Sequence, residues 1–167
     1  MKKNVSLLFA VLIALGAVFF LRRNSGPKMV WIYVQTELPA LEGVLIQTEQ
    51  QSYSRQTKSI AYIIDNQSPE EIFGGEPGGF YYVRAEQWTA EGWRYWAIDP
   101  SEEGYAPGAV GFGLMPGSTS QEFSLPFREM LPEITPGRYR LAWDFETGDP
   151  DDDEKNYTVY QEFTVEP

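Results

Sequence analysis

The residues of this sequence that could carry chemistry are its carboxylates and its aromatic rings. The chain has 24 Asp and Glu residues, ten Tyr, ten Phe and five Trp, but no His and no Cys. Ser-His-Asp and Cys-His machinery needs an imidazole, so both are excluded. The missing thiols and imidazoles also remove disulfides, cysteine-type zinc sites and most catalytic zinc sites.

Two carboxylates can hydrolyse a glycosidic bond, but their presence here does not predict a hydrolase. Glu86, Glu91, Glu102 and Glu103 lie near one aromatic-rich segment. With 24 acidic residues in the chain, some carboxylate pair falls close together in any fold. We therefore expect a protein that is not an enzyme and that uses no cofactor.

The densest acidic run, Asp149–Glu154, has the alternating acids that begin an EF-hand loop. That loop requires Gly at its sixth position and Glu at its twelfth. Glu154 and Tyr160 stand there instead, so the run is not an EF-hand. We expect a solvated hairpin loop, and the alternative is a loose calcium site at Asp149, Asp151 and Asp153.

Aromatic rings are the best candidates for binding. Strand alternation places Trp93 and Tyr95 on one face of a predicted strand and Trp96 on the other, so some rings must reach a surface. Flat exposed rings bind sugars or proteins. The expected binding residues, for a protein or glycan partner, are Trp88, Tyr95, Trp96 and Tyr105.

A Gly-rich segment, Gly104–Gly117, lies beside these rings in the sequence. It lacks the Gly-Lys-Ser/Thr of a phosphate-binding loop and enters no helix. We predict a long mobile loop at one end of the domain, a common place for recognition.

Charge divides the chain into two parts. Residues 1–27 hold four basic and no acidic residues, and the remainder holds nine basic and 24 acidic residues, a net charge of −15. Such a domain repels nucleic acids and anionic membrane surfaces. We expect no nucleic-acid partner.

The N-terminal segment predicts a membrane anchor. Residues 5–21 form an uncharged, apolar run between Lys2-Lys3 and Arg22-Arg23. At about 1.5 Å per residue the run spans roughly 25 Å, and the flanking cations extend its reach to the interface. A cleaved signal peptide is the alternative, but no Ala-x-Ala site precedes Asn24, which favours an uncleaved signal anchor.

The basic residues on the two sides of this run nearly balance, and the free α-amino group favours an N-terminus inside the cell. We therefore predict a single-pass protein of the cell membrane. Residues 1–23 would form the signal anchor and transmembrane helix, residues 24–29 a linker, and residues 30–167 an extracytoplasmic domain.

The body of the chain is typical of short strands separated by turns. From Val30 onward no segment keeps a helical period, whereas several alternate with period two, as Ile60, Tyr62 and Ile64 do. The predicted strands are residues 29–36, 43–47, 58–66, 80–88, 93–98, 118–125, 137–145 and 156–165, with one helical turn at 127–131. This pattern favours an all-β sandwich.

Two aromatic residues are expected in the core. Pro136-Gly137 predicts a tight turn before a strand that Tyr139 enters with its ring inward and its hydroxyl near the connecting loop. That arrangement is a tyrosine corner. Trp93 is expected between the two sheets.

Three motifs together resemble the bacterial immunoglobulin-like domains of exported, cell-surface Gram-positive proteins. One is a strand that ends in an Asn and a turn, Ile60–Ser68. Another is a Gly before an aromatic-rich hairpin that contains Gly92-Trp93. The third is the L-x-P-G-x-Y-R type of segment at Leu131–Leu141.

The resemblance covers about residues 43–165 and implies an immunoglobulin-like β-sandwich of 7–9 strands without catalytic residues. The chain also resembles small proteinase-inhibitor sandwiches, which share the Asn turn, the Trp strand and the P-G-x-Y segment. We expect a membrane-anchored binding or structural module. Protease inhibition through a sandwich-end loop and carbohydrate binding are the alternatives.

Overall fold

The computed structural model describes residues 27–74, 83–101, 111–148 and 155–167. The chain divides into two units, one of Met1–Met29 with Ile98–Tyr105 and one of Val30–Ala97 with Ala106–Pro167. Within the described ranges, no helix is long and apolar enough to cross a membrane. Several predictions concern residues outside these ranges, namely the anchor at 1–23, Tyr105, Asp149, Asp151 and Asp153.

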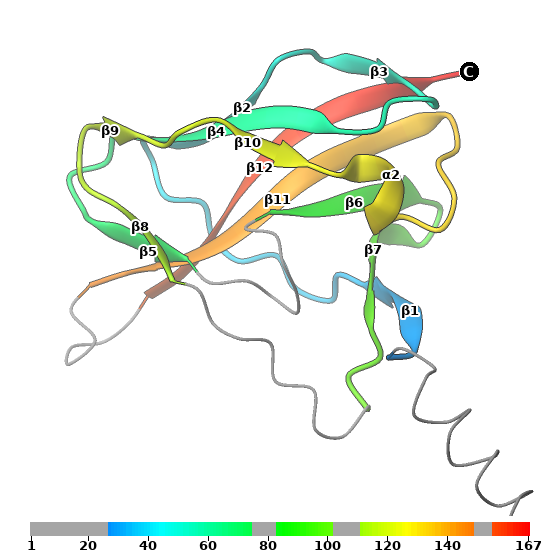
Figure 1. Ribbon diagram of the computed structural model, residues 1–167. Coiled ribbons are helices and arrows are strands. Elements are labelled where there is room, and N and C mark those ends of the chain that lie inside the picture. The colour runs from blue at the N-terminus through cyan, green and yellow to red at the C-terminus, as the bar shows by residue number, and fades with distance from the viewer. Residues whose placement is uncertain (1–26, 75–82, 102–110, 149–154) are drawn as a thin grey trace, which may run out of the picture. The chain divides into compact units, whose positions relative to one another are not determined.

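The second unit is built from two β-sheets (Figure 1). The eight-stranded sheet contains β1 (Met29–Tyr33), β3 (Ser52–Ser54), β5 (Ile72–Gly74), β6 (Arg84–Thr89), β7 (Gly92–Ile98), β8 (Phe112–Leu114), β11 (Gly137–Thr147) and β12 (Lys155–Glu166). Its strand order is β1-β7-β6-β11-β12-β3, and β5 pairs with both β11 and β8.

The four-stranded sheet contains β2 (Val44–Thr48), β4 (Ile60–Asn66), β9 (Ser118–Thr119) and β10 (Phe123–Leu125). Its order is β10-β4-β2, and β9 pairs with β4. One short helix, α2 (Phe127–Met130), follows β10. The prediction of an all-β fold with a single helical turn near residue 127 is confirmed for the described residues.

The hydrophobic core lies between the inner faces of the two sheets. On β4 the alternating residues Ile60, Tyr62 and Ile64 are buried, as the period of two predicts. They belong to one cluster with the buried residues of β11, which include Tyr139 and Trp143. Each sheet thus contributes one apolar row, the usual construction of a sandwich.

Tyr139 forms the expected tyrosine corner. Its ring is fully buried, and its hydroxyl donates a hydrogen bond to the carbonyl oxygen of Thr135 (2.8 Å) and accepts one from the Thr135 amide (3.1 Å). The side-chain amide of Gln87 donates to the same hydroxyl (2.9 Å). The corner therefore ties the segment before β11 to strand β6.

The tryptophan between the sheets is Trp143, and the prediction of Trp93 there is wrong. Trp93 is buried, but it faces away from the core cluster, on the same side as Trp88, its partner in β6. Trp143 is fully buried and stacks on Phe145 at 5.0 Å. A Cβ atom at Gly74 would lie 2.1 Å from the Trp143 ring, so this position requires glycine.

The shortest strands are not evident in the sequence pattern. Residues 112–114 form β8, which pairs with β5, so the Gly104–Gly117 segment is not one continuous mobile loop. The predicted strand 118–125 is divided into β9 and β10, and both pair with β4. Strands this short do not show alternation and are defined only by their partners.

In the first unit, Asp99 has three hydrogen-bond donors. Lys28 Nζ donates to Oδ2 at 2.6 Å, and the amide and hydroxyl of Ser101 donate to Oδ1 at 3.0 and 2.7 Å. The hydrogen bond from Lys28, with those from Ser101, lowers the pKa of Asp99 from 3.8 to about 2. Each of these bonds favours the ionised carboxylate.

We expect the substitution Lys28→Gln to raise the pKa of Asp99 toward 3.8, measured by NMR titration of the carboxyl carbon. Because the folded pKa is depressed, this carboxylate stabilises the folded state above pH 3.8. That contribution is lost as the pH falls through about 2. An unchanged titration curve in the variant would show that Lys28 has no part in the shift.

Substituting Tyr139→Phe should lower the free energy of unfolding by about 1–3 kcal/mol, because the amide and carbonyl of Thr135 lose their hydrogen-bond partner and the Gln87 side-chain amide loses one of its two acceptors. Urea denaturation measures this difference. The matched control is Tyr157→Phe, whose hydroxyl makes no hydrogen bond with any described residue. The control should change stability by less than about 0.5 kcal/mol.

Candidate functional site

The candidate site is the outer face of the eight-stranded sheet, the face that points away from the core cluster. Strand pairing brings its side chains together, because directly paired residues point to the same side of a sheet. Glu86 pairs with Tyr95 on one side and with Arg140 on the other, and Arg140 pairs with Glu162. The outer face therefore runs continuously across β7, β6, β11 and β12.

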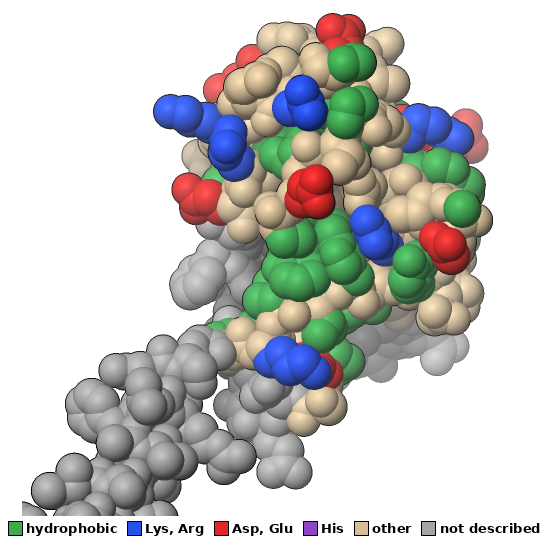
Figure 2. Space-filling view, turned by 90° about the vertical axis from the view of Figure 1, so that its right-hand side faces the viewer, with side chains coloured by type: hydrophobic (Ala, Val, Ile, Leu, Met, Phe, Trp, Pro, Cys, Tyr) green, Lys and Arg blue, Asp and Glu red, His purple; other side chains and the backbone are tan. Residues whose placement is uncertain are grey.

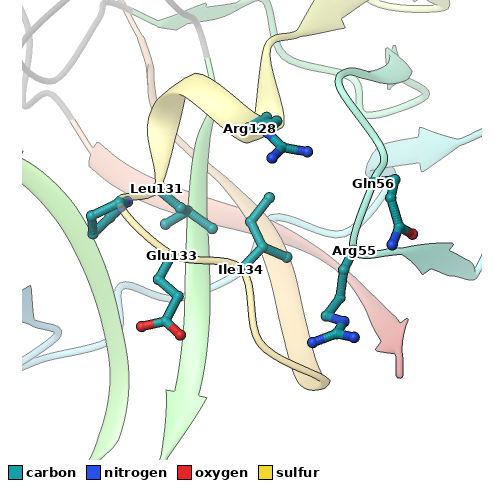
Figure 3. Close-up of a pocket in the computed structure, with 7 residues that line it drawn as sticks. Arg55, Gln56, Arg128, Leu131, Glu133 and Ile134 are labelled. Carbon is teal, nitrogen blue, oxygen red and sulfur yellow. The ribbon is translucent and has the colours of Figure 1, made fainter.

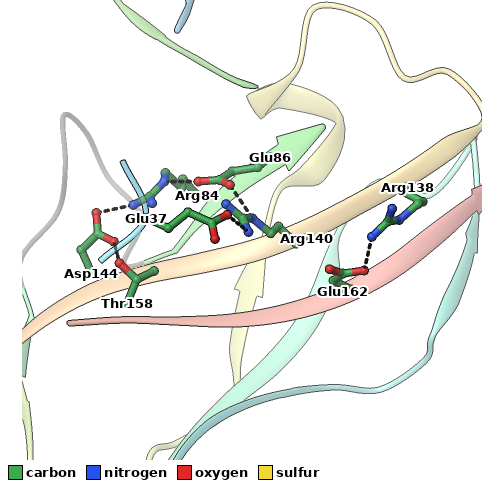
Figure 4. Close-up of polar contacts among 8 residues, drawn as sticks. All are labelled: Glu37, Arg84, Glu86, Arg138, Arg140, Asp144, Thr158 and Glu162. Atoms are coloured by element: carbon green, nitrogen blue, oxygen red, sulfur yellow. Dashed lines mark hydrogen bonds and ion pairs between the residues drawn. The ribbon is translucent and has the colours of Figure 1, made fainter. Parts of the chain in front are cut away.

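A buried ion-pair network occupies the middle of this face (Figure 4). Glu86 is fully buried and its two carboxylate oxygens bind different arginines, Arg84 Nε and Arg140 Nε, each at 2.6 Å. Arg84 also binds Asp144, which in turn accepts a hydrogen bond from Thr158. Glu86 is therefore the bridge that joins the two arginines.

Arg140 is also enclosed by aromatic rings. Its guanidinium lies 4.3 Å from the centre of the Trp93 ring and 3.8 Å from that of Tyr160. Arg140 NH1 binds Glu37 at 2.8 Å, and NH2 has no hydrogen-bond partner among the described residues. Cation–π contact and the Glu86 bridge together compensate for removing this cation from water.

One segment, residues 34–39, covers the network. The Val34 amide donates to the Trp93 carbonyl at 2.9 Å, and the Thr158 amide donates to the Pro39 carbonyl at 3.0 Å. The segment thus crosses the outer face from β7 to β12, and Glu37 reaches Arg140 from it. This cover explains why charged residues on a sheet exterior are buried.

Arg84 and the two tyrosines beside the network keep their ordinary charge at neutral pH. Burial lowers the pKa of Arg84, but hydrogen bonding to Asp144 and the negative charges of Glu86 and Asp144 outweigh burial and raise it. Burial raises the pKa of the Tyr95 and Tyr160 hydroxyls above 10.0. The arginine thus stays charged and both phenols stay protonated.

Beside the network the exposed side chains of Trp88, Arg138 and Glu162 surround the buried Trp93, and we call these four residues the Trp88 patch. The Trp88 side chain is 45% exposed and meets the Trp93 ring edge-on at 5.1 Å. The guanidinium of Arg138 lies 5.4 Å from the centre of the Trp88 ring and 5.7 Å from that of Trp93. Arg138 also pairs with Glu162 at 3.0 Å.

The β6–β7 hairpin fixes the position of Trp88. Its turn places Gly92 at a φ of 118°, a backbone conformation that residues other than glycine rarely adopt. The Thr89 hydroxyl donates to the Gly92 carbonyl at 3.0 Å and closes the turn. An exposed indole on a fixed turn is pre-arranged for contact.

The predicted binding residues do not form one surface. Trp88 and Tyr95 lie on the outer face, whereas Trp96 packs edge-on against Trp31 at 5.3 Å and against the core. Adjacent residues of a strand point to opposite sides of the sheet, which separates Tyr95 from Trp96. Tyr105 lies outside the described residues.

Sequence reasoning missed Arg138, Arg140 and Glu162 as members of this face. The signal was present in β11, where Arg138, Arg140 and Asp144 alternate with buried apolar residues. Such a pattern normally indicates solvent-facing side chains. The aromatic and carboxylate partners come from strands far away in the sequence, so the pattern could not reveal the network.

Within the described ranges, no group of three or more Asp or Glu side chains could hold a metal ion. The calcium candidates Asp149, Asp151 and Asp153 lie outside those ranges.

Residues 40–164 match the family model described as bacterial Ig-like domain. The match covers most of the chain and nearly all of the two sheets, with β1 outside it. No curated protein matches the chain.

Removing Glu86 should destabilise the domain strongly. We expect Glu86→Ala to lower the free energy of unfolding by about 3–5 kcal/mol, because it leaves buried arginine charge without its bridge. Urea denaturation measures this loss.

The double variant Glu86→Leu with Arg140→Met is the matched comparison, since it removes both charges and keeps side-chain volume. The double variant should lower the free energy of unfolding by less than Glu86→Ala does, because the Glu86 and Arg140 charges no longer have to be removed from water. A double variant less stable than the single one would contradict this interpretation of the network.

Proposed function

The chain belongs to the family of bacterial immunoglobulin-like domains, and from this premise we propose that it is a membrane-anchored, extracytoplasmic module that binds a partner through the Trp88 patch and catalyses no reaction. The observation that carries the binding role is the 45% exposure of Trp88 on a fixed hairpin. Large exposed rings at such places are the residues that dominate binding energy when covered.

The chemistry of the patch favours a protein partner. Trp and Arg are the side chains most enriched at the centres of protein interfaces. Arg138 and Glu162 are each more than half exposed and offer hydrogen bonds around the indole. A partner that covers Trp88 would bury apolar surface and keep the charged pair at its rim, as ordinary interfaces do.

A glycan is the second candidate partner, because the indole of Trp88 is a flat exposed ring with a donor, Arg138, and an acceptor, Glu162, beside it. Sugar rings stack on such surfaces while their hydroxyls bond to neighbouring polar groups.

The anchor and the location rest on the sequence. Residues 5–21 are uncharged and apolar, with basic residues on both sides. The proposal that the domain catalyses no reaction also rests on the sequence, because the chain has no His or Cys for the usual pairs of nucleophile and base. The long-range repulsion between this acidic part and anionic lipid also favours a domain held away from the bilayer surface.

Membrane topology is testable in bacterial cells that express the full chain. After addition of a protease to intact spheroplasts, we expect the domain to be degraded while a cytoplasmic marker protein survives. The protein should also remain in the membrane fraction after a high-salt wash. Protection of the domain until the cells are lysed would contradict the outward orientation.

The Trp88 patch is testable with a photoreactive amino acid placed at single positions of the full chain in cells. We expect a discrete cross-linked product from position 138, beside Trp88, and its loss when Trp88→Ala is added. Position 45 on β2 is the matched control, because Leu45 is similarly exposed at 49% but lies on the other sheet. Equal products from both positions would contradict a specific patch.

The same variants separate a protein from a glycan partner. Detergent-solubilised full chain would be applied to insoluble cell-wall polysaccharide and to a glycan array. Binding that Trp88→Ala abolishes and Leu45→Ala preserves would identify a glycan. Binding unaffected by Trp88→Ala would show that this patch does not bind the polysaccharide.

A further inference from the structure

Exposed charges on this domain do not select a ligand. Figure 2 shows cationic and anionic side chains scattered over one face of the molecule. The hollow beside α2 is lined by Arg55, Arg128 and Glu133, all of them exposed, and Figure 3 shows Ile134 between the two arginines. Solvated charges of this kind contribute little to binding. A buried cation with an unsatisfied donor is a stronger indication of a ligand.

Arg140 is such a cation. Its side chain is 4% exposed, its Nε binds Glu86 at 2.6 Å and its Nη1 binds Glu37 at 2.8 Å (Figure 4). Its Nη2 is buried and has no hydrogen-bond partner among the described residues. Nη1 and Nη2 form one edge of the guanidinium group, on which a freely placed carboxylate makes two parallel hydrogen bonds. Glu37 makes one of these bonds, so it is an incomplete partner.

Glu37 belongs to the segment 34–39, which covers the network and is held loosely. Residues 35–39 are all exposed, and the Glu37 side chain itself is 56% exposed. Besides Glu37, backbone hydrogen bonds at its two ends, one at Val34 and one at Pro39, hold the segment to the sheet. The family match begins after the segment, at residue 40, and includes the strands of the network. The segment can therefore leave the outer face without opening the hydrophobic core.

The covering segment is coupled to the Trp88 patch through Trp93. The centre of the Trp93 ring lies 4.3 Å from the guanidinium of Arg140 and 5.1 Å from the centre of the Trp88 ring. The Trp93 carbonyl accepts the hydrogen bond from Val34 at one end of the segment. Trp93 is 8% exposed, whereas Trp88 is 45% exposed. Release of the segment would therefore uncover Arg140 and Trp93 directly beside Trp88 and enlarge the patch.

We propose that residues 34–39 are an autoinhibitory cover, and that a protein partner displaces them by placing a Glu or Asp carboxylate on both Nη1 and Nη2 of Arg140. This inference rests on the proposed binding role of the Trp88 patch and names the chemistry of its partner. In the closed domain, Glu37 occupies the position of the partner's carboxylate. The partner then contacts Trp88, Trp93 and Arg140 together.

The backbone groups beneath the segment favour a protein over a glycan. The Trp93 carbonyl and the Thr158 amide lose their backbone partners when the segment leaves. Another polypeptide backbone can supply an amide and a carbonyl in their place. The acidic part of this chain carries a net charge of −15 and repels strongly acidic partners. We therefore expect one Glu or Asp within an otherwise neutral or basic surface.

Competition with Glu37 determines what the partner must supply. Because Glu37 is part of the same chain, its effective concentration at Arg140 is in the millimolar range or above. A free carboxylate such as acetate does not displace it at lower concentrations. A partner gains the second hydrogen bond, to Nη2, and buries the Trp88 ring, and these two contributions together outweigh the tethered carboxylate.

Opening of the cover is measured without any partner, by NMR-detected hydrogen exchange of the full chain in detergent micelles. We expect Glu37→Gln to speed exchange of the Val34 and Thr158 amides about fivefold, because a neutral side chain holds the buried arginine less strongly than a carboxylate does. The Thr164 amide, which also lies on β12 and donates to a loop carbonyl at 3.0 Å, should not change.

The matched control variant for this experiment is Glu42→Gln, which removes an equal charge from an exposed residue outside the segment. It should leave all three amides unchanged. Equal exchange of the Val34 and Thr158 amides in Glu37→Gln and Glu42→Gln would show that Glu37 does not hold the cover closed, and the proposal would fall.

Acceptance of an external carboxylate is tested with a peptide of sequence YVQTELPA, capped at both ends, which copies residues 33–40. In the full-chain variant Glu37→Ala, we expect it to shift the NMR signals of the Arg140 Nε–H and the Trp93 indole, with a dissociation constant on the order of 1 mM. The same peptide with Gln in place of its Glu should bind about tenfold more weakly. An amide spectrum like that of the unsubstituted chain shows that the variant is folded.

Two results of the peptide experiment would overturn the proposal. Equal binding of the two peptides would show that Arg140 does not recognise a carboxylate. The absence of shifts at about 10 mM peptide would show that the outer face does not accept a second segment.

The autoinhibitory role is tested with the photoreactive amino acid at position 138 in cells. We expect at least about threefold more cross-linked product in Glu37→Gln than in Glu42→Gln, because the weakened cover is open in a larger fraction of molecules. An equal or smaller yield would overturn the autoinhibitory role and leave the Trp88 patch as the partner site. The absence of product in every variant would instead contradict the patch itself. A product that glycosidases degrade and proteases do not extend to a second protein would overturn the choice of a protein partner.

Discussion

The structure depends on the alternation of side chains along β11. This strand pairs with β6 and β5 on one side and with β12 on the other, so its residues cannot rotate without breaking both ladders. One set of its side chains, from Tyr139 to Phe145, forms the core, and the other, from Arg138 to Asp144, forms the outer face. A slip of one residue would exchange the two sets and bury the charges in the core.

Because of this constraint, the charged side chains of the outer face lie where a covering segment buries them and where each has an ion-pair partner. Glu86 bridges Arg84 and Arg140, and the segment 34–39 excludes water from above them. A buried bridge of this kind costs desolvation energy and gains specificity, because the covering segment has one position in which Glu37 meets Arg140. The network therefore holds the segment 34–39 in place, and Trp88 beside it stays exposed.

The Trp88 patch lies on the paired strands β6, β7, β11 and β12, so the strand register fixes the positions of its side chains. The Gly104–Gly117 segment, predicted to be one long mobile loop, contributes residues 112–114 to β8.

The sequence determined the class of the fold, the major strands, the tyrosine corner and the absence of imidazole and thiol chemistry, because each depends on local pattern or composition. Alternation at Ile60, Tyr62 and Ile64 and the Pro136-Gly137 turn are properties of a few neighbouring residues. Only the tertiary structure decided which tryptophan lies between the sheets, because the period of two gives two faces and does not say which one meets the other sheet. It also decided the partners of Arg140, since these contacts join residues far apart in the sequence.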